Sequence, residues 1–290
     1  MSSRPAHLTP SREYFTGWGA SQFDLDAYTK RVGFDGPLRP DLDTLVGLHR
    51  AQPTHISFEN LDIVLGRGID ISLEALQRKL IHQRRGGYCY EANLLFAAAL
   101  EAAGFTVTGA LARSRIDSDA LRPATHAILL VWLDDDAPWL ADAGFGGRGL
   151  LEPIRVTDGN ESTQGSWRFR LDQVDETEWI LSTTDADGWK DLYGFTQVPR
   201  YPFDFAVANH FTSTHARSPF TGRLVAQRVG EHTRILLVDT ELTVLHGSAK
   251  SETTTIAAAD IPAVLTERLG ISLTDAEYAA VVTAVAAKTG

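Results

Sequence analysis

The stretch Arg84-Arg85-Gly86-Gly87-Tyr88-Cys89-Tyr90-Glu91 contains the only cysteine of the 290-residue chain. The residues that follow, Cys89–Ala103, are rich in Ala, Leu and Glu, which are strong helix formers, and Gly104 stands where a helix commonly ends. Upstream, Ser72 is a candidate N-cap for a helix with leucines at helical spacing. The stretch therefore predicts a flexible turn between two helices, with Cys89 in the first turn of the second.

The position of Cys89 suits a nucleophile. A helix N-terminus and nearby positive charge both favour thiolate over thiol, and the amides at a helix start can donate to a developing oxyanion. Glu91 also suits the helix dipole, but its charge opposes a thiolate unless it is turned away or paired with Arg84 or Arg85. Most free cysteines are buried apolar side chains, so the residue alone leaves both interpretations open.

A nucleophilic cysteine needs a base, and the base needs a group that orients it. His126 begins an apolar run that predicts a buried strand, and Asp142 follows on a return strand 16 residues later. A hairpin would bring the two within a few residues of each other across the ladder, although the register stays open. A structural histidine and a turn aspartate are the alternatives. The remaining eight histidines show no comparable placement beside a strand that bears an acid: His7, His49, His55, His82, His210, His215, His232 and His246.

The order of the predicted elements favours an α+β fold with segregated layers. Apolar residues at helical spacing dominate the first hundred residues, and short apolar runs bounded by turn residues dominate residues 105–200. The predicted strands of this middle part are 106–108, 110–116, 128–133, 139–143, 167–171 and 179–182. The last third combines strands at 224–229 and 234–238 with two helices, one of which opens with a capping box at 274–277.

Composition excludes several classes of protein. The chain has ordinary globular composition, a formal net charge of −10 and a pI near 5.3, so it has no electrostatic footprint for nucleic acid and little attraction to anionic membrane. One cysteine excludes an intrachain disulfide and a cysteine-cage metal site. We recognise no signal peptide at the N-terminus and no long apolar span, so we expect a cytoplasmic protein without membrane partners.

Several blocks resemble the arylamine N-acetyltransferases, the bacterial type in particular. The cysteine block Arg85–Glu91 is similar to that family's signature, and Thr125-His126 and Asp142-Ala143-Gly144-Phe145-Gly146 are similar to its second and third blocks. The N-terminal segment Phe58–Asp62 also fits, and the blocks follow in family order from about residue 23 to residue 240.

The resemblance implies a fold of three parts and a catalytic triad. The parts are a helical bundle at residues 1–104, an antiparallel β-barrel at 105–205 and an α/β lid at 206–290, of which the first two resemble a cysteine-peptidase core. The implied triad is Cys89, His126 and Asp142.

The resemblance also implies the activity. The family transfers acetyl from acetyl-CoA, a co-substrate and not a permanently bound cofactor, to arylamines, arylhydroxylamines or hydrazines by a ping-pong route through acetyl-cysteine. Phe145 and Phe220 are then expected to line the amine pocket, and Thr125, Gly146 and Gly147 to contact coenzyme A. No metal is expected.

The run Gly144–Gly149 matches the G-x-G-x-x-G motif, but Pro153 follows too soon for the long helix of a dinucleotide-binding fold. We therefore interpret the glycines as a turn after a strand, or as an amide nest for a phosphate.

Three other functions share this pattern. A macrolactam-forming amide synthase would use the same triad with another acyl group, and a cysteine hydrolase would use it with water. A binding module that has lost catalysis is disfavoured, because all three triad residues are present. The physiological amine, the acyl-chain preference and the oligomeric state stay open.

Overall fold

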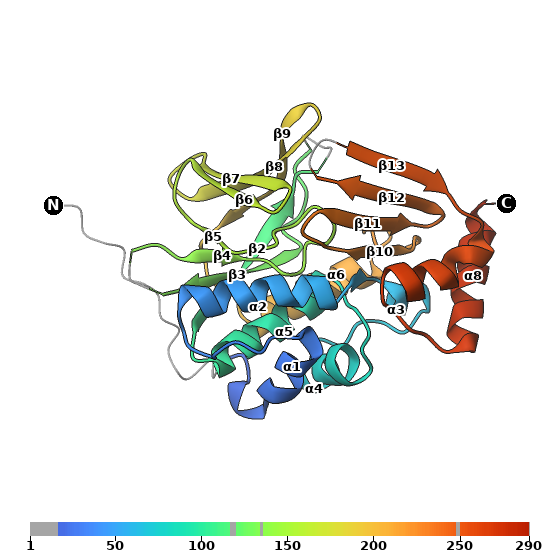
Figure 1. Cartoon of the computed structure of the whole chain (residues 1–290), viewed down its shortest axis with the longest axis horizontal. Coiled ribbons are helices and arrows are strands. Elements are labelled where there is room, and N and C mark those ends of the chain that lie inside the picture. The colour runs from blue at the N-terminus through green and yellow to red at the C-terminus, as the bar shows by residue number, and fades with distance from the viewer. Residues whose placement is uncertain (1–16, 117–119, 134–135, 248–249, 290) are drawn as a thin grey trace.

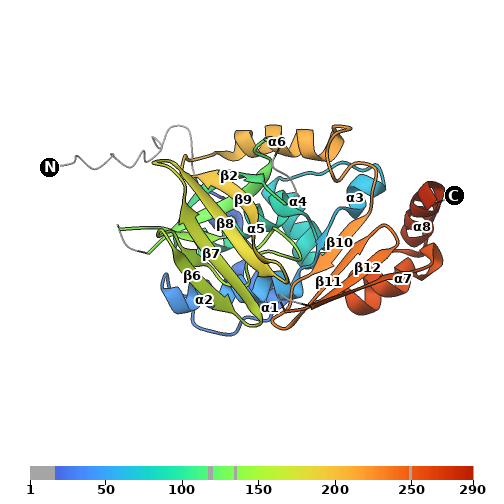
Figure 2. The same ribbon diagram turned by 90° about the horizontal axis from the view of Figure 1, so that it is seen from above.

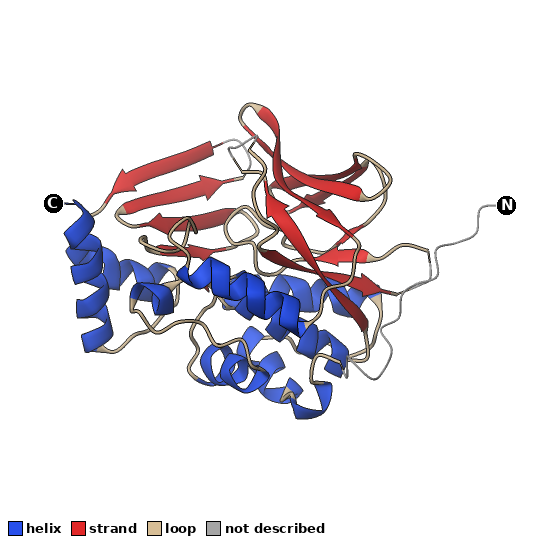
Figure 3. Cartoon of the chain, turned by 180° about the vertical axis from the view of Figure 1, so that it is seen from behind, coloured by secondary structure: helices blue, strands red, loops and turns tan. Residues whose placement is uncertain are grey.

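The computed structural model describes residues 17–116, 120–133, 136–247 and 250–289. Within them, helices and strands occupy separate layers, with the N-terminal helices below two antiparallel sheets (Figures 1 and 3). The N-terminal stretch in which we recognised no signal peptide lies outside the described residues. No helix in the described part of the chain has both the length and the apolarity that crossing a bilayer requires.

The N-terminal layer is a helical bundle built around one central helix. Its helices are α1 (Leu25–Val32), α2 (Leu42–His55), α3 (Leu61–Val64), α4 (Leu73–Leu76) and α5 (Cys89–Ala102). A 3₁₀ turn (Ala20–Gln22) precedes α1, and a π-helical segment (Gln77–His82) continues α4. Of the 14 residues of α5, 12 are buried, so α5 is the centre on which the other helices and the barrel pack.

The middle of the chain forms a nearly closed antiparallel barrel. Its strands, in chain order, are β2 (Thr106–Ser114), β3 (His126–Trp132), β4 (Trp139–Ala141), β5 (Ile154–Arg155), β6 (Asn160–Gln164), β7 (Trp167–Gln173), β8 (Glu178–Asp185) and β9 (Gly188–Thr196). In the described residues they form one eight-stranded sheet in the order β5-β4-β3-β2-β9-β8-β7-β6.

A second sheet is completed by the N-terminal part of the chain. Its strands are β1 (Phe58–Glu59), β10 (Val225–Arg228), β11 (Thr233–Val238), β12 (Glu241–His246) and β13 (Lys250–Thr255), paired in this order. Helix α6 (Pro202–Thr214) precedes β10 in sequence, and α7 (Ile261–Ala263) and α8 (Asp275–Thr289) flank the far end of the sheet (Figures 1 and 2). Short 3₁₀ and π-helical segments, Ala258–Asp260 and Val264–Arg268, adjoin α7.

Strand β3 joins the helical core to the barrel core. Its odd-numbered residues Ala127, Leu129 and Val131 pack in the cluster of the helices, and Ile128 and Leu130 pack inside the barrel. Both faces of β3 are therefore buried, which explains why its sequence is a continuous apolar run. A third apolar cluster holds the second sheet to α7 and α8.

The predicted α+β fold with an antiparallel barrel is confirmed. The part boundaries predicted at 104/105 and 205/206 stay a prediction; α6 begins at Pro202 and β1 joins the last sheet. The strand predicted in two pieces around Gly109 is one strand, β2, in which a Cβ at Gly109 would lie 2.8 Å from the rings of Phe205 and Trp18. The strand predicted to reach Ala143 ends at Ala141, which leaves Asp142 in a loop.

Candidate active site

Cys89 is the first residue of α5 and is 3% exposed. The turn before it is tied to the chain beside β1, because the Gly87 amide donates to the carbonyl of Ser57 (3.2 Å) and Glu59 donates to the carbonyl of Gly87 (3.1 Å). A Cβ at Gly86 would lie 2.2 Å from the Ser57 carbonyl oxygen, so only glycine permits this approach. The turn therefore holds Cys89 at the N-terminus of α5.

Glu91 stabilises the start of this helix. Its carboxylate accepts a hydrogen bond from the Tyr88 amide (3.1 Å) and forms an ion pair with Lys79 (2.7 Å). The expectation from the sequence that Arg84 or Arg85 pairs with Glu91 is therefore wrong. Burial raises the pKa of Glu91 to about 7, with Lys79 opposing and the Glu59 charge adding to the rise.

Lys79 and Arg85 connect Glu91 to two further acids. Lys79 contacts Asp62 (2.6 Å), and Arg85 contacts Glu59 (2.8 Å) and Asp62 (3.4 Å). Burial alone would lower the pKa of Lys79, but the three carboxylates around it raise that pKa, so the ammonium stays charged. We call Glu59, Asp62, Lys79, Arg85 and Glu91 the charged network.

His126 and Asp142 meet across the β3–β4 hairpin. The ladder pairs Leu129 with Ala141, which places Asp142 two positions from the partner of His126. His126 Nε2 lies 2.7 Å from Asp142 Oδ2. The predicted proximity of the two residues is thus seen in the structure, although part of the turn predicted around Asp134–Pro138 lies outside the described residues.

The Cys89 thiol interacts with the same imidazole and favours its charged form. Burial by itself would lower the pKa of His126, but the charge and hydrogen bond of Asp142, with a smaller contribution from Cys89, raise it to about 10. The three side chains therefore form one connected chain in which the imidazole is readily protonated.

Asp142 is enclosed by neutral hydrogen-bond donors. It is 1% exposed, and its Oδ1 accepts from Asn93 Nδ2 (2.9 Å) and from the Gly144 amide (3.1 Å). Its own amide donates to His49 Nε2 (2.9 Å). Burial would raise the pKa of Asp142, but His126 and these donors hold it below its ordinary value, so the group is a carboxylate.

Sequence reasoning missed three residues of this site. Asn93 lies four residues after Cys89 on α5, so helical spacing could have placed it on the same face. His49 shows no placement beside a strand that bears an acid in the sequence, yet it touches Asp142. The ring of Tyr193 lies 5.1 Å from that of His126, and no local signal in β9 marks it.

Phe145 and Phe220, the predicted amine-pocket residues, contact different aromatic rings at or beside the triad. The Phe145 ring is 4.9 Å from that of His126. The Phe220 ring is 5.8 Å from Tyr88 and 5.7 Å from Phe58. Both side chains are partly exposed, as a wall that contacts a substrate requires.

The residues predicted to contact coenzyme A divide into two places. Thr125 precedes β3, and its carbonyl accepts from Tyr90 (2.7 Å). Gly146 and Gly147 lie against the second sheet, where the Gly147 amide donates to the side chain of Gln227 (2.6 Å). A phosphate at this glycine turn would therefore have to displace Gln227.

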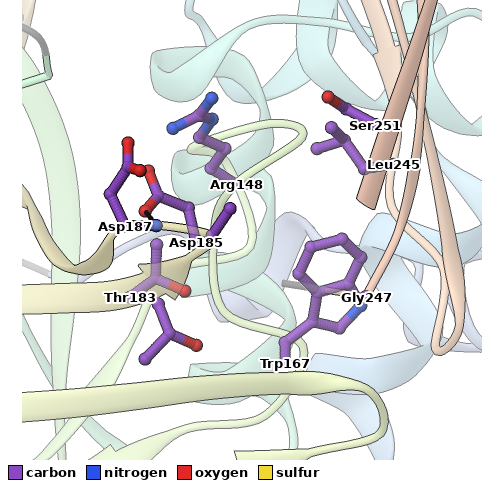
Figure 4. A pocket seen from close by; sticks show the side chains of 10 residues that line it. Arg148, Trp167, Thr183, Asp185, Asp187, Leu245, Gly247 and Ser251 are labelled. Carbon is purple, nitrogen blue, oxygen red and sulfur yellow. Dashed lines mark hydrogen bonds between the residues drawn. The ribbon is translucent and has the colours of Figure 1, made fainter. Parts of the chain in front are cut away.

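A cavity of about 180 Å³ lies between the barrel and the second sheet (Figure 4). Arg148, Trp167, Asp185 and Leu245 are among its lining residues, and no triad residue is among the described residues that line it. No cluster of three or more metal-ligating side chains occurs in the described part of the chain.

Comparisons with known proteins agree with this geometry. The profile of a family described as N-acetyltransferase matches residues 41–278. An arylamine N-acetyltransferase of Mycolicibacterium smegmatis is 37% identical over 257 residues, which cover 87% of this chain and 93% of the relative. The crystal structure of the Nocardia farcinica arylamine N-acetyltransferase superposes with a TM-score of 0.88 at 43% identity, covering 92% of this chain and 95% of that one.

A third comparison involves a relative solved with CoA bound. The Mycobacterium marinum arylamine N-acetyltransferase, solved in complex with CoA, superposes with a TM-score of 0.83 at 32% identity, covering 90% of this chain and 98% of that one. With a match over most of the chain in both sequence and fold, this protein belongs to the arylamine N-acetyltransferase family and is an acyltransferase.

Proposed function

We propose that this enzyme acetylates arylamines, arylhydroxylamines or hydrazines with acetyl-CoA by a ping-pong mechanism through an acetyl-Cys89 intermediate. The observation that carries the proposal is the continuous contact from Cys89 through His126 to Asp142. In this proposal Cys89 is the nucleophile, His126 transfers protons, and Asp142 orients the imidazole and balances its charge.

The first half-reaction exchanges one thioester for another. His126 takes the thiol proton, and the Cys89 thiolate attacks the acetyl carbonyl of acetyl-CoA. The C–S bond to CoA then breaks, and His126 returns its proton to the leaving CoA thiolate. Bond types on the two sides are the same, so this exchange is close to balanced and proceeds without the amine.

The second half-reaction makes the process favourable. The amine attacks the acetyl-Cys89 carbonyl, His126 accepts the amine proton, and the Cys89 thiolate leaves. The new amide has resonance that a thioester lacks, so the step is downhill. An aromatic amine is mostly unprotonated near neutral pH, which is a chemical reason for this class of acceptor.

The flanking residues complete the proposal. We assign Phe145 and Phe220 to the amine pocket, and Thr125, Gly146 and Gly147 to the coenzyme A side. The complex of the Mycobacterium marinum relative with CoA supports acetyl-CoA as the co-substrate. The parts at residues 1–104, 105–205 and 206–290 would supply the nucleophile, the base with its acid, and a lid.

Burial favours transfer over hydrolysis. Cys89 and His126 are only 3% and 7% exposed, which limits the access of water to an acyl intermediate. A cysteine hydrolase would instead discharge the intermediate without an amine.

Intact-mass spectrometry tests the proposal. Incubation with acetyl-CoA alone should add one acetyl group, located on the peptide that bears Cys89, and an arylamine should then remove it. Cys89→Ala is the control and should gain no mass, because the chain has no other cysteine. Product that forms from both substrates together, with no adduct from acetyl-CoA alone, would show direct transfer in a ternary complex.

A further inference from the structure

His49 connects the helical bundle to the loop that carries the triad acid. It lies in α2 (Leu42–His55), its side chain is fully buried, and its ring meets Phe96 of α5 edge-on at 5.6 Å. Its two nitrogens reach across to the segment after β4. Nδ1 lies 3.0 Å from the carbonyl of Leu151, and Nε2 lies 2.9 Å from the amide of Asp142.

These two contacts fix the protonation of His49. The Asp142 amide can only donate, so Nε2 must carry a lone pair, and the Leu151 carbonyl can only accept, so Nδ1 must carry the proton. A charged imidazolium would set one N–H group against another. Burial lowers the pKa of His49 to about 4, although the Leu151 carbonyl and the Asp142 charge act in the opposite direction, so the neutral form persists near neutral pH.

The amide of Asp142 depends on this histidine for its hydrogen bond. Strand β4 ends at Ala141, so Asp142 lies beyond the last ladder position, and it is 1% exposed. The next amide, that of Ala143, is bound by Asn93 (3.0 Å), which also donates to the Asp142 carboxylate. His49 and Asn93 therefore hold the backbone at two consecutive amides, and this backbone sets the direction in which the carboxylate projects toward His126.

We propose that His49 is a positioning residue for the triad: its Nε2 lone pair holds the backbone of Asp142 so that the carboxylate meets His126. His49 touches no reacting atom and acts only through Asp142. The inference rests on the proposed triad, but its test needs neither acetyl-CoA nor an amine.

Two substitutions separate the two hydrogen bonds of His49. In His49→Gln the amide oxygen can take the place of Nε2 and accept from Asp142, whereas the bond to Leu151 is lost. In His49→Asn the amide nitrogen can take the place of Nδ1 and donate to Leu151, but the side chain is too short to reach Asp142. Each variant keeps a polar side chain and loses one bond, so each is the control for the other.

The measurement is the rate of alkylation of Cys89 by iodoacetamide as a function of pH, which reports the thiolate of the only cysteine in the chain. A displaced Asp142 stabilises the His126 imidazolium less, so the thiolate forms at higher pH. We expect His49→Asn to move the midpoint up by about one pH unit, and so to slow alkylation about tenfold below the midpoint. We expect His49→Gln to keep the wild-type profile.

The outcomes are decisive in each direction. Equal profiles for the wild type and His49→Asn, or equal shifts in both variants, would overturn the positioning role. A variant that is alkylated like the urea-unfolded chain at every pH would place His49 in folding alone and would overturn it too. If the profiles follow the expectation and acetyl-CoA still gives no adduct, the proposed function fails while the inference stands.

Discussion

The turn that presents Cys89 is anchored by charged side chains, whereas the loop that presents Asp142 is anchored by neutral ones. On the first side, Glu91 holds the Tyr88 amide and is itself held by Lys79. On the second side, His49 and Asn93 hold the chain through hydrogen bonds between uncharged groups and the backbone. Both anchors are buried, but only the first contains ion pairs.

This difference follows from what each side must do. The Cys89 turn has to keep a backbone geometry, and ion pairs between Lys79 and its carboxylates can do so at a distance from the thiol. The Asp142 carboxylate has to stabilise the His126 imidazolium, and a second cation beside it would compete for the same carboxylate. Neutral donors orient Asp142 without that competition, so the raised pKa of His126 depends on them.

The largest expected effect is on the neutral side. Asp142→Asn removes the charge but keeps the shape, so the fold should persist while the rate of acetyl transfer falls about 10²-fold or more. Steady-state kinetics over a pH series, with circular dichroism for folding, measures both. The control is Asp172→Asn, at a half-exposed barrel position paired with Arg170 (2.7 Å), which should leave the rate unchanged. An unchanged rate and pH profile in Asp142→Asn would remove Asp142 from the triad.

On the charged side, we expect a substitution to lower the stability of the fold. Lys79→Met leaves the buried Glu59 and Glu91 and the partly exposed Asp62 with only Arg85 and Arg67 to neutralise them. Removal of one partner of a buried ion pair costs about 3–5 kcal/mol. Denaturant unfolding should show this loss, and the folded fraction should keep most of its rate.

The neighbouring residue provides a matched control for that substitution. Arg78 forms only an exposed ion pair with Glu74 (3.7 Å), so Arg78→Met should cost less than about 1 kcal/mol. Equal losses in Lys79→Met and Arg78→Met would mean that the charged network does not stabilise the turn.

The pH dependence of stability should separate the two sides. The folded-state pKa of Glu91 is raised from 4.5 to about 7, and that of His126 from 6.5 to about 10. For each group the folded protein binds a proton that the unfolded chain has lost, so its stabilisation is complete below the unfolded value and disappears as pH rises through the folded value. The melting temperature should therefore fall by a few degrees across each window.

Two variants test which group causes the loss of stability in each pH range. Glu91→Gln should flatten the melting curve against pH between about 4.5 and 7, and Asp142→Asn should flatten it between about 6.5 and 10. Thermal melts in a pH series measure both slopes. If either variant flattens the other's window, the two anchors are coupled, which contradicts the comparison.

The sequence was informative where local chemistry and burial agree. Cys89 follows a glycine turn and opens a helix of strong helix formers, and β3 is an apolar run buried on both faces, so both could be predicted. Polar edge strands could not: β6 reads NESTQ and β13 reads KSETTT, and pairing alone makes them strands. Helix α6 was also missed, because Phe203 and Val207 face solvent and break the usual amphipathic pattern.

The same distinction applies to the site. Cys89, His126 and Asp142 lie in motifs that can be recognised from the neighbouring residues in the sequence, so all three could be identified as candidates. His49 and Lys79 act through contacts 93 and 12 residues away along the chain, which depend on how α2 and the π-helical segment pack. No local pattern encodes such a contact, so it becomes visible only in three dimensions.

The smallest expected effect concerns the two phenylalanines next to the triad. Phe220 rests on Tyr88 beside the charged anchor, and Phe145 rests on His126 beside the neutral one. If they line the amine pocket, Phe145→Ala and Phe220→Ala should change the ratio of kcat/KM between a single-ring and a larger arylamine by about tenfold.

The control is Phe169→Ala: Phe169 is fully buried in the barrel core, so this change should cost about 3–5 kcal/mol with no change in selectivity. Since both pocket candidates are partly exposed, their loss in melting temperature should be smaller than that of the control. Melting losses as large as the control's, with unchanged selectivity, would assign both rings to packing and leave the amine pocket to other residues.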